Sequence, residues 1–568
     1  MTRSLCSALV RAVALVFCIG APLLAQQPRG AAPPPPRSVA PRITPAEIDG
    51  HLRFLSSDLL VGRAPATHGG RITASYIASQ LLGFGVVPGN DTSYFQQVPI
   101  DIVDADRGSL RIAASVRRDG DTAGASLRYP EDVVAWAGSA TEQSAARGEL
   151  VFVGYGASAP EYRWDDFKGA DVKGKVLLVL VNDPLAPASE PNHFGGKAMT
   201  YYGRWTYKFE EAERRGAAGA LIIHTTERAG YPWHTVVGSW AKEQRMLPRD
   251  PKLPAPLGVR GWITDSAATA LISSAGLDLA ALRKQAESRD FRPVATRITM
   301  DISFRNDVQR QQSENVVGVV RGREAAARDE YIVFSSHWDH LGVGPVVDGD
   351  SIYNGAADNA SGVANLLAVA RAAAQGPAPR RSLLFVFVTA EESGLLGSEF
   401  FASRPTVPIA KIVANLNMDG GNLLGESRDL RVLGDTKSSL GPMLTRLIAP
   451  RGMRISPDQH PERGYFYRSD HFSFAKAGVP AVSIAAGFDY VGRPAGWGKE
   501  RADEYNARHY HQPSDEYRAD FDLRGAAQLS RIVLDFALSL ANTKVWPTWN
   551  TDAEFERVAG GGEGQSVP

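Results

Sequence analysis

Five short segments of the sequence combine histidine and carboxylate side chains at spacings that could hold metal ions. In chain order, their principal residues are His337 with Asp339, Asp358, Glu391 with Glu392, Asp419, and Tyr510 with His511. Imidazole and carboxylate are the ligands that zinc takes when thiolates are absent. Two histidines and three or four carboxylates suffice for two ions that share a bridging carboxylate. These residues therefore predict a two-metal centre.

Each segment taken alone also has an ordinary structural explanation. Adjacent acidic residues such as Glu391 and Glu392 usually lie on a solvated surface. Asp358 could cap a helix, and Asp419 could form a turn. Their joint placement favours a shared site, because three of the segments directly follow predicted strands. Ligands of open α/β sheets gather at the carboxyl ends of the strands.

The elements that must position these residues form an alternating series from residue 315 onward. Helices are predicted over residues 361–374 and in parts of 439–449 and 526–541. Strands are predicted over residues 316–320, 331–335, 383–388, 412–416, 430–433 and 479–484. This alternation predicts an α/β fold with a mostly parallel mixed sheet and helices on both faces.

The sequence pattern between residues 148 and 290 differs from that of its surroundings and predicts an inserted, small β-rich domain. Apolar runs at residues 150–153, 176–181 and 220–223 are separated by many Gly, Trp and Tyr residues. The rest of the chain is predicted to form a catalytic domain in two parts, an N-terminal part at residues 43–147 and the remainder at 291–545. A flexible tail is predicted at residues 546–568.

The N-terminus has the features of a removable signal peptide at residues 1–25. Arg3 and Arg11 flank its start, and the apolar stretch that follows is too short and too interrupted by proline for a comfortable membrane span. A retained anchor is the alternative. Residues 26–42 form a Pro-rich linker. We therefore expect a secreted or periplasmic protein.

Composition excludes several other classes of function. Cys6 and Cys18 both lie in the predicted signal peptide, so the mature chain has no disulfide, cysteine nucleophile or thiolate ligand. Lys+Arg and Asp+Glu both number 62, and this zero net charge argues against nucleic acid as the main partner. No later segment is apolar enough over a sufficient length to predict a membrane span.

The order of the motifs, His-x-Asp, Asp-Asn-x-Ser-Gly, Glu-Glu, Asp and Tyr-His, resembles peptidase family M28, whose members include bacterial aminopeptidases. The similarity covers about residues 315–541, with support at 60–99, and residues 148–290 resemble a protease-associated (PA) domain. The resemblance implies a cis peptide bond between Asp358 and Asn359. It also implies two zinc ions with these ligands: His337 and Asp419 for the first, Glu392 and His511 for the second, and Asp358 bridging both.

The resemblance implies roles for three further residues. Asp339 would orient the imidazole of His337, as an outer partner often does for metal-bound histidine. Glu391 would be the general base that takes a proton from the metal-bridging water and delivers it to the leaving amine. Tyr510 would help stabilise the tetrahedral intermediate. Two zinc ions would lower the pKa of their bound water towards ~7.

Substrate direction is less well determined by the sequence. Glu391 and Asp419 could hold the ammonium group of a peptide or protein N-terminus, which favours an aminopeptidase. A carboxypeptidase would need Arg or Lys to clamp a carboxylate, and no arginine cluster stands near the ligands. Arg468 is a candidate substrate-binding residue, although a surface salt bridge explains it equally well.

Two other classes of function share this fold. A glutaminyl-cyclase-like transferase would typically keep one zinc ion, and the intact pair of His337 and Asp419 argues against it. A non-catalytic binding protein would be expected to lose ligands, and none is missing. The same ligands could also hold Co²⁺ or Mn²⁺. The sequence makes no prediction of oligomeric state.

Overall fold

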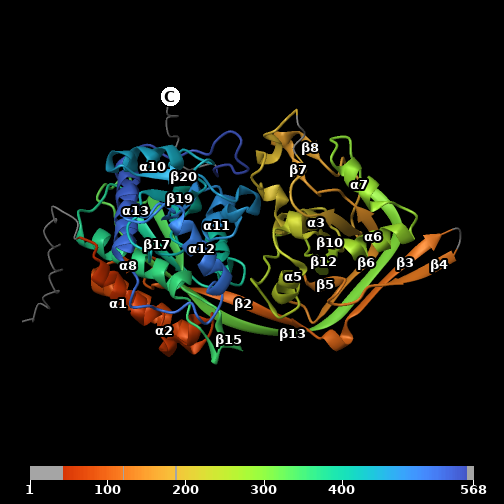
Figure 1. The fold of residues 1–568 in the computed structure, drawn as a ribbon, viewed down its shortest axis with the longest axis horizontal. Coiled ribbons are helices and arrows are strands. Elements are labelled where there is room, and N and C mark those ends of the chain that lie inside the picture. The colour runs from red at the N-terminus through yellow and green to blue at the C-terminus, as the bar shows by residue number, and fades with distance from the viewer. Residues whose placement is uncertain (1–41, 119–120, 186–188, 559–568) are drawn as a thin grey trace, which may run out of the picture.

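The computed structural model describes residues 42–118, 121–185 and 189–558. Two bodies lie side by side and are joined by a long ribbon of two strands (Figure 1). The predicted signal peptide and nearly all of the Pro-rich linker lie outside the described residues. Within the described residues, no helix combines the length and apolar character needed to cross a membrane.

The body that carries the predicted metal-centre residues, called the catalytic body, is built on a mixed sheet. Four parallel strands form the centre of this sheet. These are β17 (Ser382–Val388), β14 (Tyr331–His337), β18 (Ile412–Asn417) and β21 (Ala481–Ala486). The flanking strands are β1 (Val87–Pro88) and the end of β13 (Val294–Val320) on one side, and β19 (Asp429–Leu433) and β20 (Arg454–Ser456) on the other. The predicted α/β architecture is confirmed.

Alternating side chains of the central strands fill two cores, as the period of two residues requires. In β14, Ile332 and Phe334 face one core, whereas Tyr331 and Val333 face the other. The first core is covered by α1 (Pro45–Leu55), α2 (His68–Phe84), α8 (Ser361–Gln375), α10 (Leu440–Ile448) and α13 (Arg524–Asn542). The second is covered by α9 (Leu396–Ser403) and α11 (His471–Lys476). Helix α11 lies on the side that faces the second body (Figure 1).

The second body has its own sheet, with helices on both faces. Across the sheet the strands are β4 (Asp121–Ser126), β3 (Arg111–Arg118), the start of β13, β6 (Gln143–Phe152), β9 (Val176–Leu180), β10 (Gly219–His224), β12 (Val259–Thr264) and β5 (Val133–Ala137). One face packs on α6 (Asp265–Ser274) and α7 (Leu279–Ala286). The other packs on α3 (Trp205–Arg214) and α5 (Trp233–Trp240).

A single strand belongs to both bodies. Strand β13 pairs with β3 and β6 near its start, with β2 (Phe95–Ala105) along its middle, and with β17 at its end. The β2–β13 ribbon runs from Asn306 opposite Ala105 to Val316 opposite Phe95. Both crossings between the bodies are therefore made by hydrogen-bonded strands.

The boundaries of the second body differ from those expected from sequence. The expected insertion began at residue 148 and ended at 290, but β3, β5 and β6 share its core, and so do residues of β13 as far as Phe304. Because β2 and β13 run through both bodies without a break, no loop marks either border. The C-terminal segment also packs within its described part, where Trp546 and Phe555 are buried.

Candidate metal centre

The residues singled out in the sequence converge at the carboxyl ends of the central strands. His337 is the last residue of β14, Glu391 and Glu392 follow β17, and Asp419 follows β18. Asp358 lies just before α8, in a segment that folds back over the strand ends. This is the edge at which parallel α/β sheets bind their ligands.

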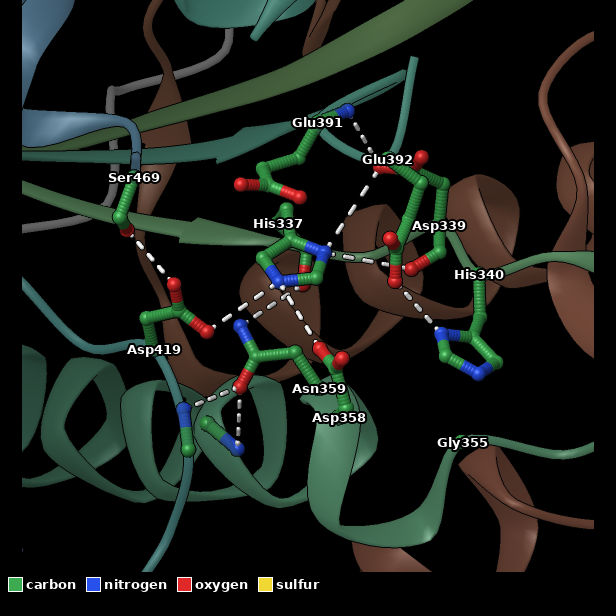
Figure 2. Close-up of polar contacts among 12 residues, drawn as sticks. His337, Asp339, His340, Gly355, Asp358, Asn359, Glu391, Glu392, Asp419 and Ser469 are labelled. Atoms are coloured by element: carbon green, nitrogen blue, oxygen red, sulfur yellow. Dashed lines mark hydrogen bonds and ion pairs between the residues drawn. The ribbon is translucent and has the colours of Figure 1, made fainter. Parts of the chain in front are cut away.

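His337 stands between two carboxylates (Figure 2). Its Nε2 lies 3.3 Å from Asp419 Oδ1 and 3.4 Å from Asp358 Oδ1. The ring is 1% exposed. The three groups offer one nitrogen and two oxygens to the same small volume, within the 4.8 Å spacing expected of ligands to a single ion.

A second group of candidate ligands lies around the other carboxylate oxygen of Asp358, Oδ2. His511, which follows α12 (Trp497–Arg508), places its Nε2 3.3 Å from Asp358 Oδ2 and 3.1 Å from Glu392 Oε2. Asp358 therefore lies between the two groups and presents one oxygen to each. His340 is the additional residue here, since its Nδ1 lies 2.7 Å from Glu392 Oε1.

The donors of both groups fit zinc. They are imidazole nitrogens and carboxylate oxygens, the set that zinc binds where thiolates are absent. A cluster of buried carboxylates without a cation would be costly. A resident cation is therefore consistent with the burial of Asp339, His337 and Glu392.

Asn359 ties the metal-centre segments together. The bond between Asp358 and Asn359 is cis, as expected. The Nδ2 of Asn359 donates to Ser336 Oγ at 3.1 Å, to the His337 carbonyl at 3.2 Å and to the Met418 carbonyl at 3.3 Å. Its Oδ1 accepts from the amide N–H groups of Gly362 and Gly420. One buried side chain thus joins β14, the residues after β18 and the start of α8.

Asp419 is held by a chain of buried hydrogen bonds that the sequence did not reveal. Ser469 Oγ donates to Asp419 Oδ2 at 2.6 Å, and Asn417 Nδ2 donates to Ser469 Oγ at 2.8 Å. Ser335 Oγ donates in turn to Asn417 Oδ1 at 2.6 Å. The only sequence signal was the stretch beside Arg468, which contains Ser469.

Asp339 lies beneath the centre, but its contact with His337 differs from the expected one. The Nδ1 of His337 is 3.2 Å from the main-chain carbonyl of Asp339 and 3.9 Å from its carboxylate. The Asp339 carboxylate instead accepts the amide N–H of Glu391 at 3.1 Å. Burial raises the pKa of Asp339 to about 7. The residue thus links the segment after β14 to the segment after β17.

Glu391 and Tyr510 occupy different settings beside the centre. The carboxylate of Glu391 comes within ligand spacing of His337 and Glu392, and burial raises its pKa well above the usual range. The ring of Tyr510 stacks on His511 at 3.9 Å between centroids and is 47% exposed. Glu391 therefore lies inside the centre and Tyr510 at its solvent rim.

Arg63 is a positioning residue that the sequence did not reveal. It is 1% exposed, and its guanidinium donates to the carbonyls of Trp338 at 2.9 Å, Gly355 at 3.0 Å and Asn354. Burial lowers its pKa to about 10. Apart from the carbonyl of Leu55, its partners lie 275 to 292 positions away in sequence, so no local pattern could identify it. The buried cation supports the loops on either side of His340.

Comparisons with known proteins find a family match over the part of the chain that carries the candidate metal centre. Residues 315–537 match the model of peptidase family M28. The chain is 27% identical over 304 residues to the probable glutamate carboxypeptidase AMP1 of Arabidopsis thaliana, covering 48% of this chain and 38% of that protein. It is 26% identical over 269 residues to leucine aminopeptidase 2 of Trichophyton rubrum, covering 44% and 50%. The chain thus spans half or less of the length of these curated relatives.

Among solved structures, an aminopeptidase from Aneurinibacillus sp. strain AM-1 aligns at a TM-score of 0.47 with 18% identity, covering 88% of this chain and 94% of that one. A zinc aminopeptidase from Bacillus subtilis aligns at 0.41, also with 18% identity, covering 89% and 97%. The family model covers the strands and loops that carry His337, Asp358, Glu391, Glu392, Asp419 and His511. The chain therefore contains a domain of peptidase family M28.

Proposed function

We propose that the protein is a secreted metallo-exopeptidase with two zinc ions, acting on peptide or protein N-termini as an aminopeptidase. The observation that carries the proposal is the position of Asp358, whose two oxygens lie 3.4 Å from His337 and 3.3 Å from His511. A carboxylate placed between two histidines in this way suits a bridge between two ions.

The proposed ligands divide into two sets. His337 and Asp419 would hold the first ion, Glu392 and His511 the second, and Asp358 both. When bound, the two ions would supply a nucleophilic water of lowered pKa and stabilise negative charge on the substrate oxygen.

The proposed base is Glu391. Its buried carboxylate has a raised pKa, so it can accept a proton at the carboxylate oxygen and release it to the leaving amine. Glu392 is the adjacent residue but has a different partner, His511, at 3.1 Å. Neighbouring residues after a strand point in alternating directions, so the two glutamates can have separate tasks.

Tyr510 is proposed to donate its hydroxyl to the oxyanion of the tetrahedral intermediate. Its ring stacks on His511 and remains half-exposed, so the hydroxyl is accessible to substrate. Asp339 is proposed to set the position of Glu391 through the main-chain hydrogen bond at 3.1 Å. Removal of either side chain should lower turnover without removing the metal ligands.

The test uses the full chain purified from its secreted form, with unblocked and N-acetylated peptides as substrates. Wild type is compared with Glu391→Gln, with and without a chelator. Cleavage of unblocked peptides only, lost with chelator and reduced about 10²–10⁴-fold in the variant, supports the proposal. Equal cleavage of acetylated peptides would instead favour a carboxypeptidase of the same family.

Two further outcomes would reject hydrolysis. Cyclisation of N-terminal glutamine with one bound zinc per chain would favour a glutaminyl-cyclase-like transferase. Two bound metals without turnover of any peptide would favour a binding protein. Export is proposed only from residues 1–25 of the sequence, and N-terminal sequencing of the exported protein would test cleavage near Ala25.

A further inference from the structure

Two arginines at the junction of the two bodies have no acidic partner. Arg204 immediately precedes α3 of the second body, and Arg468 lies before α11 of the catalytic body. The Nε of each is buried without a hydrogen-bond partner. Within the described ranges, no carboxylate forms an ion pair with either guanidinium. The guanidinium of Arg468 lies over the ring of Tyr465, with its central carbon 5.4 Å from the ring centroid.

The two guanidinium groups are electrostatic neighbours. Burial lowers the pKa of Arg204 to about 10, and the positive charge of Arg468 is the next largest cause. Burial raises the pKa of Tyr231 to about 12, and the positive charges of Arg204 and Arg468 both oppose that rise. Tyr231 is therefore within electrostatic range of both guanidinium groups. Residues beside Arg204 and Arg468 also touch, since the rings of Tyr201 and Tyr467 lie 5.9 Å apart.

Other buried arginines of the chain are satisfied. Arg63 donates to several main-chain carbonyls, and Arg381 pairs with Glu330 at 2.6 Å. Arg204 is 8% exposed, and its Nε is buried without a hydrogen-bond partner. Burying a guanidinium without an acceptor is unfavourable, and a second positive charge adds repulsion. An anion would therefore stabilise the pair, and the described residues supply none in an ion pair with either arginine.

The position of Arg468 indicates where that anion comes from. The next residue, Ser469, donates to Asp419 at 2.6 Å, so Arg468 is one residue from the hydrogen-bond chain of the metal centre. We propose that Arg204 and Arg468 together bind a carboxylate of the peptide substrate, with one arginine contributed by each body. This inference rests on the proposed peptidase function. It identifies the substrates as short peptides that present a carboxylate to the junction of the two bodies.

The carboxylate can come from two sources, the C-terminus of a short peptide or an Asp or Glu side chain. Paired guanidinium donors bind either one. The first source predicts a loss of affinity when the C-terminus is amidated. The second predicts a loss when Asp or Glu is replaced with Asn or Gln in the peptide. In both cases the second body acts in substrate selection.

The first experiment measures binding without hydrolysis. N-acetylglycine and its amide are titrated into the full-length protein, and the shift in melting temperature is followed. Wild type should be stabilised by the acid and not by the amide, and both Arg204→Met and Arg468→Met should lose that response. Arg147→Met is the matched control, because Arg147 is 77% exposed and lies 3.7 Å from Asp301 in the second body. Equal responses to acid and amide would overturn the proposal.

The second experiment measures KM and kcat for dipeptides and tripeptides, their C-terminal amides, and peptides that carry Asp or Glu in place of Asn or Gln. Each arginine variant should raise KM for the carboxylate-bearing peptide about 10- to 100-fold, the usual worth of a charge-assisted hydrogen bond. KM for the neutral peptides should not change. Arg204→Lys should restore part of the affinity.

The melting temperature distinguishes binding from a structural role. Replacing an unpaired buried charge with an apolar side chain of similar length should leave stability unchanged or increased. A lower melting temperature with equal losses on charged and neutral peptides would make Arg204 a structural residue and overturn the proposal. Absence of hydrolysis by wild type, with the acid-specific thermal response intact, would reject the peptidase function and leave the carboxylate site standing.

Discussion

His340 Nδ1 lies 2.7 Å from Glu392 Oε1, whereas His511 contacts the other oxygen of the same carboxylate at 3.1 Å. Glu392 thus has a histidine on each side, and only one of them was predicted as a ligand. His340 is fully buried beside Gly355, and His511 is partly exposed. This arrangement suits a ligand at His511 and an orienting hydrogen bond from His340.

The two histidines should therefore respond differently to substitution. His511→Ala is expected to reduce bound zinc from two ions per chain to one. His340→Ala is expected to keep two sites but weaken one of them about 10- to 100-fold, the usual effect of losing an outer partner of a ligand. Zinc content and competition with a chelator measure both effects. The reverse pattern would make His340 the ligand and His511 the outer partner.

Ser469→Ala should weaken zinc binding although Ser469 is not a proposed ligand. The substitution removes the 2.6 Å hydrogen bond that fixes Asp419 and leaves Asn417 Nδ2 without its 2.8 Å acceptor. We expect about a 10- to 100-fold loss of affinity at the first site. The measurement is a chelator competition with the second site followed separately.

A matched serine provides the control for Ser469. Ser539 on α13 is exposed and its hydroxyl donates to the carbonyl of Phe536 at 2.7 Å. Ser539→Ala should leave zinc affinity unchanged. An unchanged affinity in Ser469→Ala as well would mean that Asp419 keeps its position without the hydroxyl.

The sequence could indicate that the proposed metal-centre residues lie together because the placement of three of them follows a rule of sheet geometry. His337, Glu392 and Asp419 follow three parallel strands, and the carboxyl ends of those strands meet at one edge. The structure brings them together with Asp358 and His511. Asp358 and His511 do not follow strands, and their proposed roles came from the order of the motifs.

Long-range contacts could not be predicted in the same way. Arg63 donates to the loops around His340 from a segment far away in sequence, and a lone arginine has no periodicity that reveals its partners. The border of the second body has no local signal in the sequence for a related reason, because β13 continues unbroken from one sheet to the other. The charge of Arg468 acts on Arg204 only in the folded chain, so a search along the sequence for clustered arginines could not find this pair.

His471 should make stability depend on pH. Burial lowers its pKa to about 3 from a usual value near 6.5. Between these values the unfolded chain binds a proton that the folded chain does not. The free energy of unfolding should therefore fall as pH drops below about 6.5, by about 1.4 kcal/mol per pH unit from this group.

Denaturant unfolding from pH 7 to pH 4, in the presence of chelator, measures that slope. His471→Leu should reduce that slope by about 1.4 kcal/mol per pH unit, the contribution of one proton. Phe466→Leu is the control, because Phe466 packs on His471 at 4.8 Å between ring centroids but carries no titrating group. It should lower stability by a similar amount at every pH. An unchanged slope in His471→Leu would show that this histidine does not cause the acid sensitivity.

Gly355 should be irreplaceable for two separable reasons. Its φ is +55°, which strains any residue with a Cβ, and an added Cβ would lie 2.1 Å from the Asp358 carbonyl and 2.5 Å from the His340 ring. Gly349 has φ +91° with open space around its Cβ position, so it shares the backbone strain and lacks the contacts. Gly349→Ala should cost about 1–2 kcal/mol of stability and leave zinc binding intact. Gly355→Ala should cost more and also lower zinc content, because relief of the contacts must move Asp358 or His340. Equal losses of stability in the two variants, with normal zinc content in both, would show that the loop can shift without disturbing the metal centre.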